Sequence, residues 1–339
     1  MKNKLRSIHF FCGIALLSPK IGALDLSIVA LILVCMITLL KSKLIIKIPN
    51  KFLNLFFLWS LVIVSCLVTF VINGKVDSIF ILKPFRQLIL LFLSILIVIS
   101  YKFRLVDIFK IVLISAIINS SFVMIQLIGH NLFGIEHFMI LPEFDINVNV
   151  SYRKPGLMSG YPHAGMLSVL GMLCLLNFIE KLNRLVFVLF WLLLSVSLIL
   201  TSRTALFAGF VPMGIFILMG MRNKVAFKKL FLFMLFGIYA IIYILSILPE
   251  DSFNVAFEMF INFSNNKGFS SLSYTALNNS YYFPNNLTTF FFGNGNFMRN
   301  DLQLNVDDGF QIMLYGCGIT YLILNCIIFI YYYLASFLI

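Results

Sequence analysis

The sequence predicts an all-α polytopic membrane protein of about ten transmembrane helices with one large polar loop. Of its 339 residues, 61% are hydrophobic and 11% are charged, with a mean hydropathy of +1.02, whereas soluble domains carry about 25% charged residues. Apolar runs long enough to cross ~30 Å of hydrocarbon as helices recur along the chain. The one long polar stretch, residues 249–310, holds six of the thirteen acidic residues. We therefore expect a single integral membrane domain, made of a helical bundle over residues 1–248, this loop, and a last membrane helix within residues 311–339.

The N-terminal segment begins with three cations, followed by a short apolar run and Pro19. Its charge and length are those of a signal peptide, but the cleavage signal over residues 21–23 is poor, which favours a first membrane helix. Either interpretation places the start of the next helix on the outer face. The further spans are expected at residues 24–40, 52–72, 80–99, 106–129, 162–180, 185–201, 203–220, 229–248 and 311–335.

The distribution of Lys and Arg gives the orientation, because the cytoplasmic loops of membrane proteins carry an excess of these residues. With the N-terminus inside, sixteen fall on the inner side and nine on the outer side. Two acids are inner and eleven are outer, so the net charge is +14 inside and −2 outside. The inner cations are Lys2, Lys4, Arg6, Lys41, Lys43, Lys47, Lys51, Lys102, Arg104, Lys110, Lys181, Arg184, Arg222, Lys224, Lys228 and Lys229. The overall net charge of +12 therefore reflects orientation in the membrane and requires no nucleic-acid partner.

Two outer loops have substantial length, residues 130–161 and 249–310. Aromatic residues recur through the second loop, which argues against disorder and predicts a folded cap. Near its start, apolar residues at i, i+3, i+4, i+7 and i+8 follow a Pro-Glu-Asp-Ser sequence, which predicts a capped amphipathic helix on the outer membrane interface. These apolar residues are Phe253, Ala256, Phe257, Phe260 and Ile261.

Two outer arginines are the main candidates for chemistry, because the orientation rule gives no reason for arginines on that face. Arg153 lies in a Gly- and Pro-rich approach to a helix, and Arg203 lies where one helix ends outside and another begins. A guanidinium group binds a diphosphate through two parallel hydrogen bonds, and the hydroxyls around Arg203, together with the amides of the next helix, favour an anion. The alternative is that both arginines reach the phosphates of lipid headgroups.

Further candidates lie on the same expected outer face, and each has a simpler interpretation. Lys83 and Arg86 would anchor a helix end in the headgroups. His163 would pack at a helix start, and the paired acids Asp307 and Asp308 would form a solvated first helical turn. The full set of candidates for substrate binding is Lys83, Arg86, Lys154, His163, Ser202, Arg299 and Asp307.

Three signatures, in this order, resemble those of the O-antigen polymerase and ligase superfamily, which are polytopic glycosyltransferases that use glycans linked to undecaprenyl diphosphate. The resemblance covers roughly residues 150–325. The signatures are the stretch from Arg153 and Gly156 to Pro162-His163, the helix-ending Ser202-Arg203-Thr204-Ala205, and Phe292-Gly293-Asn294-Gly295 followed by Asp308 and Gly316-Cys317-Gly318.

Two departures from the family pattern bear on function. His163 stands where the family commonly has Asn. The ligase branch typically has a His in the last outer loop, some eleven residues before a Gly, and here Asp307 stands eleven residues before Gly318. The second departure favours the polymerase over the ligase.

The resemblance implies a GT-C-like glycosyltransferase architecture in the bacterial inner membrane, with a cytoplasmic N-terminus and residues 249–310 in the periplasm. The implied activity is polymerisation of repeat units linked to undecaprenyl diphosphate into O-antigen or another surface polysaccharide. Arg153 and Arg203 would stabilise the leaving diphosphate, and Asp308 would orient or deprotonate the acceptor hydroxyl. Donor and acceptor are both lipid-linked glycans, a chain-length regulator is a further partner, and no nucleotide, metal or other cofactor is required.

Two alternative functions stay open. The O-antigen ligase performs the same chemistry with lipid A–core as the acceptor. A lipid-linked oligosaccharide flippase is more distant, because a flippase should bury charges along several spans, and the spans here are almost free of mid-helix charge. A metal-dependent lipid-sugar transferase is disfavoured, since no acidic pair follows the first span. Separately, the six cysteines show neither CxxC nor CxxH spacing, which gives no support for a disulfide framework or a zinc site.

The charge distribution makes the orientation testable with a membrane-impermeant thiol reagent, in a background without the native cysteines. Cysteines introduced at Ser270 and Asn285 should react in cells whose outer membrane alone is permeabilised. Cysteines at Ser42 and Asn223 should react only after the inner membrane is opened. The reverse labelling pattern would overturn the orientation and every functional assignment that depends on it.

Overall fold

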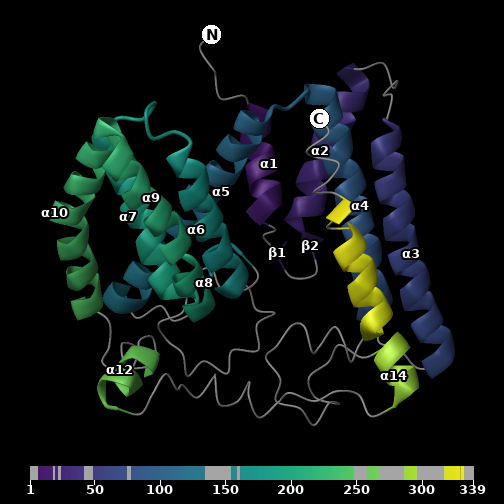
Figure 1. The fold of residues 1–339 in the computed structure, drawn as a ribbon. Helices are drawn as coiled ribbons and strands as arrows, with labels where there is room; N and C mark the ends of the chain where they lie inside the picture. Colours follow the sequence, from purple (N-terminus) through teal and green to yellow (C-terminus); the bar gives the residue numbers. More distant parts are fainter. Residues whose placement is uncertain are drawn as a thin grey trace. The chain divides into compact units, whose positions relative to one another are not determined.

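A computed structural model gives the architecture in which these segments are arranged. The residues that it describes are 7–17, 20–21, 24–41, 49–74, 78–133, 154–158, 161–247, 258–266, 286–295, 317–328 and 330–331. They form helices and connecting turns, apart from two strands of two residues each, β1 (Lys20–Ile21) and β2 (Leu24–Asp25), which pair antiparallel. The prediction of a helical protein is therefore confirmed (Figure 1).

Helices occupy all or part of each of the ten predicted spans. In chain order they are α1 (Ser7–Leu17), α2 (Leu26–Lys41), α3 (Asn50–Asn73), α4 (Ser78–Tyr101), α5 (Leu105–Phe133), α6 (Tyr161–Leu176), α7 (Arg184–Thr201), α8 (Arg203–Ala208), α9 (Phe210–Arg222), α10 (Lys224–Ile247), α12 (Glu258–Ser264), α14 (Leu287–Phe292) and an apolar helix over Cys317–Ile328. Five segments among the described residues are long and apolar enough to cross a membrane: Phe52–Asn73, Pro84–Tyr101, Leu105–Gly129, Arg184–Thr201 and Ala205–Arg222. The chain is thus a helical membrane protein by the length and composition of these segments.

Two predicted helices differ in detail from the structure. The expected span over residues 203–220 is divided at Gly209 into α8 and α9, and Pro212 explains the division, because proline has no N–H to donate to the carbonyl of Ala208. In the large loop, α12 covers the C-terminal part of the predicted amphipathic helix. The start of that helix, with its proposed cap, lies outside the described residues.

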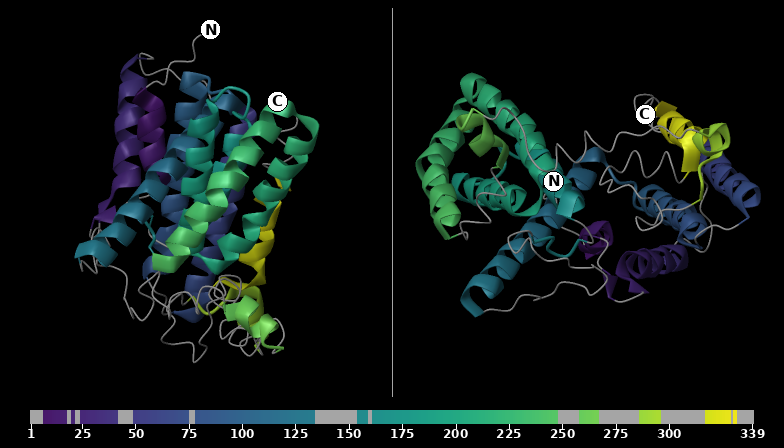
Figure 2. Two further views of the ribbon diagram at one scale, coloured as in Figure 1. Left: turned by 90° about the vertical axis from the view of Figure 1, so that its left-hand side faces the viewer. Right: turned by 90° about the horizontal axis from the view of Figure 1, so that it is seen from below.

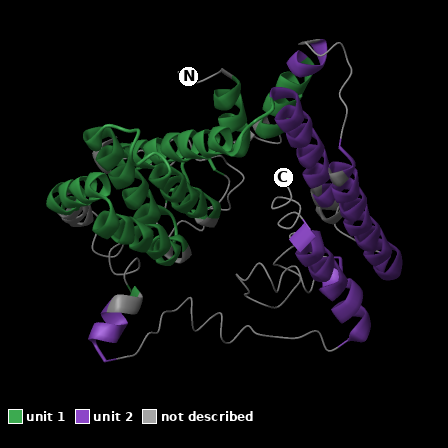
Figure 3. Ribbon diagram, turned by 45° about the horizontal axis from the view of Figure 1, so that its top comes forward, with its two compact units in different colours: residues 1–36, 102–258 green, residues 37–101, 259–339 purple. Residues whose placement is uncertain are grey.

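The chain divides into two compact units (Figure 3). Unit 1 comprises residues 1–36 and 102–258, and unit 2 comprises residues 37–101 and 259–339. In unit 1, α5, α6 and α7 pack on one another, α1 packs on α5, and α10 packs on α7 and α9. Figure 2 shows α9 and α10 side by side, joined by the turn at Asn223. In unit 2, α3 and α4 pack together, and α14 contacts α3.

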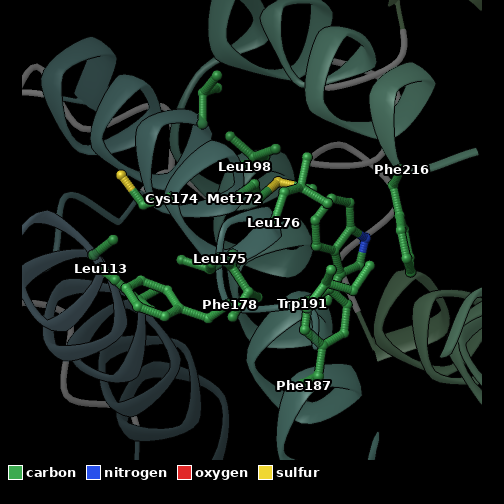
Figure 4. Packing of buried hydrophobic residues seen from close by; sticks show 14 of the residues in the cluster. Leu113, Met172, Cys174, Leu175, Leu176, Phe178, Phe187, Trp191, Leu198 and Phe216 are labelled. Carbon is green, nitrogen blue, oxygen red and sulfur yellow. The ribbon is translucent and has the colours of Figure 1, made fainter. Parts of the chain in front are cut away.

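The core of unit 1 is centred on aromatic side chains from three helices (Figure 4). Trp191 of α7 is fully buried, stacks on Phe187 with ring centroids 5.8 Å apart, and contacts Phe216 of α9 at 4.5 Å. Phe233 of α10 meets the same indole edge-on at 6.5 Å. Such aromatic pairs contribute roughly 0.5–1.5 kcal/mol beyond the area that they bury. They join α7, α9 and α10 into one packed group.

Small residues allow α5, α6 and α7 to approach closely. A Cβ atom built on Gly171 of α6 would lie 2.4 Å from the Cβ of Ala116 on α5, and 3.2 Å from Leu194 on α7. One turn toward the N-terminus of α6, the buried Ser168 hydroxyl lies 3.3 Å from that of Ser120 and 3.0 Å from that of Ser197. Close backbone approach with hydrogen bonds across the contact is the packing mode of membrane helices.

A buried lysine lies against the turn that joins α6 and α7. Lys229 of α10 is only 1% exposed, and its ammonium group donates to the carbonyls of Ile179 and Leu182 in the turn between α6 and α7, the latter at 2.8 Å. It also lies 4.9 Å from the ring centroid of Phe187. From the sequence, Lys229 is expected among the inner-loop cations. In the structure, α10 begins at Lys224, so Lys229 lies within this helix and its ammonium group binds backbone carbonyls inside the bundle.

The close contact at Gly171 generates a stability prediction with a matched control. We expect Gly171→Ala to lower the melting temperature of the purified protein in detergent, since the added methyl group overlaps Ala116 and overpacking costs about 1–3 kcal/mol. Gly214→Ala in α9 should leave the melting temperature unchanged or raise it, because no atom lies within 4 Å of the new Cβ and alanine is the better helix former. Equal effects of the two substitutions would contradict this account of the packing.

Candidate functional site

The first two signatures of the sequence meet in unit 1. The backbone N–H of Lys154 donates to the carbonyl of Leu200, near the end of α7, at 3.0 Å. A second contact lies at the start of α6, where a Cβ on Gly165 would be 2.9 Å from the Thr201 hydroxyl and 2.3 Å from the Cβ of Ala205. The stretch that follows Arg153 in sequence therefore packs against the turn that leads into Arg203.

Two buried amide side chains of α5 hold the segment Lys154–Met158. Gln126 makes a reciprocal pair of hydrogen bonds with Gly156, accepting from its N–H at 2.9 Å and donating to its carbonyl at 3.0 Å. Asn119 accepts from the N–H of Leu157 at 2.9 Å. Gln126 is 2% exposed and Asn119 is fully buried. Most of the backbone polar groups of this segment are thus satisfied by unit 1 itself, as a non-helical segment inside a membrane protein requires.

Gly156 is the residue that permits this docking. Its φ of +69° is a left-handed conformation that L-residues rarely adopt. A Cβ atom at this position would lie 2.6 Å from the side-chain oxygen of Asn119. Both observations explain the glycine in the first signature as a structural requirement for the close approach of this segment to α5.

The turn between α7 and α8 consists of a single extended residue. Ser202 has φ −153° and ψ 135°, its N–H donates to the carbonyl of Leu198 at 3.4 Å, and its carbonyl accepts from Leu206 at 3.0 Å. It is 7% exposed, and Lys154 is 4% exposed. Lys154, whose backbone N–H binds the end of α7, and Ser202, which directly precedes α8, are therefore both buried residues.

Two glycines of the third signature, Gly293 and Gly318, meet in unit 2. Gly293 follows α14, and Asn73 of α3 donates to its carbonyl at 3.1 Å, while the hydroxyls of Thr69 and Thr320 donate to the carbonyls of Phe292 and Phe291. Gly318 has φ +75°, and a Cβ there would lie 2.4 Å from the Phe291 carbonyl oxygen. The turn at Gly293 thus packs on the end of α3 and on the apolar helix over Cys317–Ile328.

The structure places the remaining predicted site residues as follows. His163 is exposed in the first turn of α6, and Arg86 is half-buried in α4, which also contains Lys83. Arg203 is the first residue of α8. Arg153, Arg299, Asp307 and Asp308 lie outside the described residues. Within the described part of the chain, no group of three metal-ligating side chains is close enough to hold an ion.

Sequence reasoning missed Asn119 and Gln126. Both lie in the span predicted at residues 106–129, and the length and hydrophobicity that predict this span do not single out individual polar residues. The signal was present, because the two amides are seven residues apart and so lie on one face of a helix. Polar side chains within a membrane span commonly face the bundle interior, and these two bind backbone there.

Comparison with known proteins finds no matching family model, no matching curated protein and no matching solved structure.

Proposed function

We propose that this protein polymerises oligosaccharide repeat units carried on undecaprenyl diphosphate, as an O-antigen polymerase of the Wzy type in the bacterial inner membrane. The observation that carries the proposal is the contact in unit 1 between the stretch that begins at Lys154 and the corner before Arg203. These are the first two of the three signatures that resemble the O-antigen polymerase and ligase superfamily. About ten membrane crossings, a GT-C-like architecture, a cytoplasmic N-terminus and a periplasmic loop over residues 249–310 belong to the same proposal.

The proposed reaction is transfer of a glycan between two lipid carriers. An acceptor hydroxyl on one repeat unit forms a bond to the anomeric carbon of the donor glycan. The bond from that carbon to the diphosphate oxygen breaks, and undecaprenyl diphosphate leaves with the electron pair. Asp308 orients the hydroxyl and accepts its proton. The energy is supplied by the sugar–diphosphate bond of the donor, so the proposal assigns no role to a nucleotide or a metal.

The arginines act where negative charge develops. Arg153 and Arg203 bind the diphosphate as it leaves, since a guanidinium group matches two phosphate oxygens at once. Lys154 and Ser202 are buried at the same corner of unit 1 and add a cation and a hydroxyl to that environment. Lys83, Arg86, His163, Arg299 and Asp307 complete the proposed contacts with the lipid-linked substrates.

Deletion of the gene distinguishes the proposed polymerase from the two alternatives. Loss of a polymerase should leave lipopolysaccharide capped with a single repeat unit, because ligation continues while extension stops. Gel analysis of lipopolysaccharide and extraction of lipid-linked glycans measure both products. Long polymer retained on undecaprenyl diphosphate, with no capped lipopolysaccharide, would instead identify a ligase, and single repeat units retained on the cytoplasmic face would identify a flippase.

Arginine substitutions test the diphosphate contact directly. Arg153→Ala and Arg203→Ala should each slow chain extension by about a hundred- to a thousandfold, equivalent to ~2.7–4 kcal/mol, because a contact that strengthens in the transition state is lost. Lysine at either position should restore little, since the paired donors are absent. Asp308→Asn should slow extension without weakening donor binding. Rates are compared at equal protein level in membranes, with Arg222→Ala, an exposed arginine in the last turn of α9, as the control. Normal polymer from both alanine variants would make these arginines lipid-headgroup anchors.

A further inference from the structure

The amide side chains of Asn119 and Gln126 in α5 bind backbone groups of a non-helical segment. Gln126 engages both backbone groups of Gly156, in the manner in which one strand pairs with another, and Asn119 engages the next residue along the chain. All three hydrogen bonds are 2.9–3.0 Å long, and both side chains are buried. Burying an amide costs free energy unless it is hydrogen-bonded. The segment binds both polar atoms of the Gln126 side chain, whereas it binds only the side-chain oxygen of Asn119.

A further hydrogen bond holds the same segment to α7. The N–H of Lys154 donates to the Leu200 carbonyl, close to the C-terminal end of α7. The segment is therefore held at three residues, at Lys154 by α7 and at Gly156 and Leu157 by α5. Two of these contacts come from side chains, and either side chain can be changed without altering the segment itself.

We propose that Gln126 and Asn119 are positioning residues, which hold the segment Lys154–Leu157 against unit 1 and act on chain extension through Arg153, the residue that precedes this segment in sequence. The proposal rests on the proposed function only for the role of that arginine. The docking of the segment stands on the hydrogen bonds alone.

The first experiment measures docking independently of activity. Gln126→Met keeps the side-chain length and removes both hydrogen bonds to Gly156. Hydrogen–deuterium exchange of the full-length protein in detergent should show faster exchange, by about tenfold or more, in peptides that contain Gly156 and Leu157, because buried backbone groups left without partners shift the equilibrium toward the undocked segment. Ser121→Ala is the matched control, since this half-buried α5 hydroxyl donates only to Ile117 of its own helix.

The second experiment tests the positioning role through a double-mutant cycle. Gln126→Met should slow chain extension by about tenfold or more at equal protein level in the membrane. Added to Arg153→Ala, it should cause no further loss, because it acts through that residue and the two effects are then not additive. A purely structural role would multiply the two losses. Should Gln126→Met fail to accumulate, Asn119→Ala, which removes the acceptor for the Leu157 N–H, replaces it in both experiments with the same expected outcomes.

The outcomes separate this inference from the proposed function. Unchanged exchange at residues 156–157 in the Gln126 variant would overturn the docking, and multiplicative losses in the cycle would overturn the positioning role. If Arg153→Ala extends chains normally, the assignment of that arginine fails and the positioning role fails with it. Faster exchange would in that case still establish that Gln126 holds the segment.

Discussion

The close approach of α5, α6 and α7 is the contact on which the rest of unit 1 depends. Lipid tails are as apolar as leucine, so membrane helices gain little from burying hydrophobic surface against one another, and their association depends on packing and hydrogen bonds. Ala116, Gly171 and the hydroxyls of Ser120, Ser168 and Ser197 provide both. Two of these helices hold the docked segment by hydrogen bonds, because α5 contributes Asn119 and Gln126 and α7 contributes Leu200. Helix α6 begins at Tyr161, just beyond that segment. A shift of one helix would therefore move the segment.

The docked segment shows how a polar connection is accommodated among apolar helices. Its backbone groups cannot be left without partners inside a low-dielectric bundle, and here they bind amide side chains and a helix-terminal carbonyl. Gly156 makes this possible, because its left-handed backbone and missing Cβ leave room for Asn119. The corner at Ser202 uses a different solution, in which one extended residue reverses the chain and its own N–H and C=O bind the neighbouring turns. Together they bring residues more than forty positions apart in sequence into contact.

Much of the helical arrangement could be predicted from the sequence, because span length and hydrophobicity are local properties that the bilayer imposes. Each predicted range contains a helix, and the predicted turn before Arg203 lies at Ser202. The division at Gly209 was predictable in principle from Pro212. The partners of Asn119, Gln126 and Lys229 were not, because the sequence shows a polar residue in a span but not which carbonyl it will meet. Likewise the glycines of two signatures were recognised as a pattern, whereas their steric reason at Gly156 and Gly318 requires the neighbouring chain.

The buried position of Lys229 has a consequence for the order in which unit 1 is assembled. Its ammonium group is satisfied by the carbonyls of Ile179 and Leu182, and a buried cation without such acceptors is strongly destabilising. Helix α10 therefore gains its full stability only once the turn between α6 and α7 has formed. That turn precedes α10 in the chain by more than forty residues, so a ribosome delivers the acceptors before the donor. The turn that supplies the acceptors is therefore synthesised before the helix whose buried cation requires them.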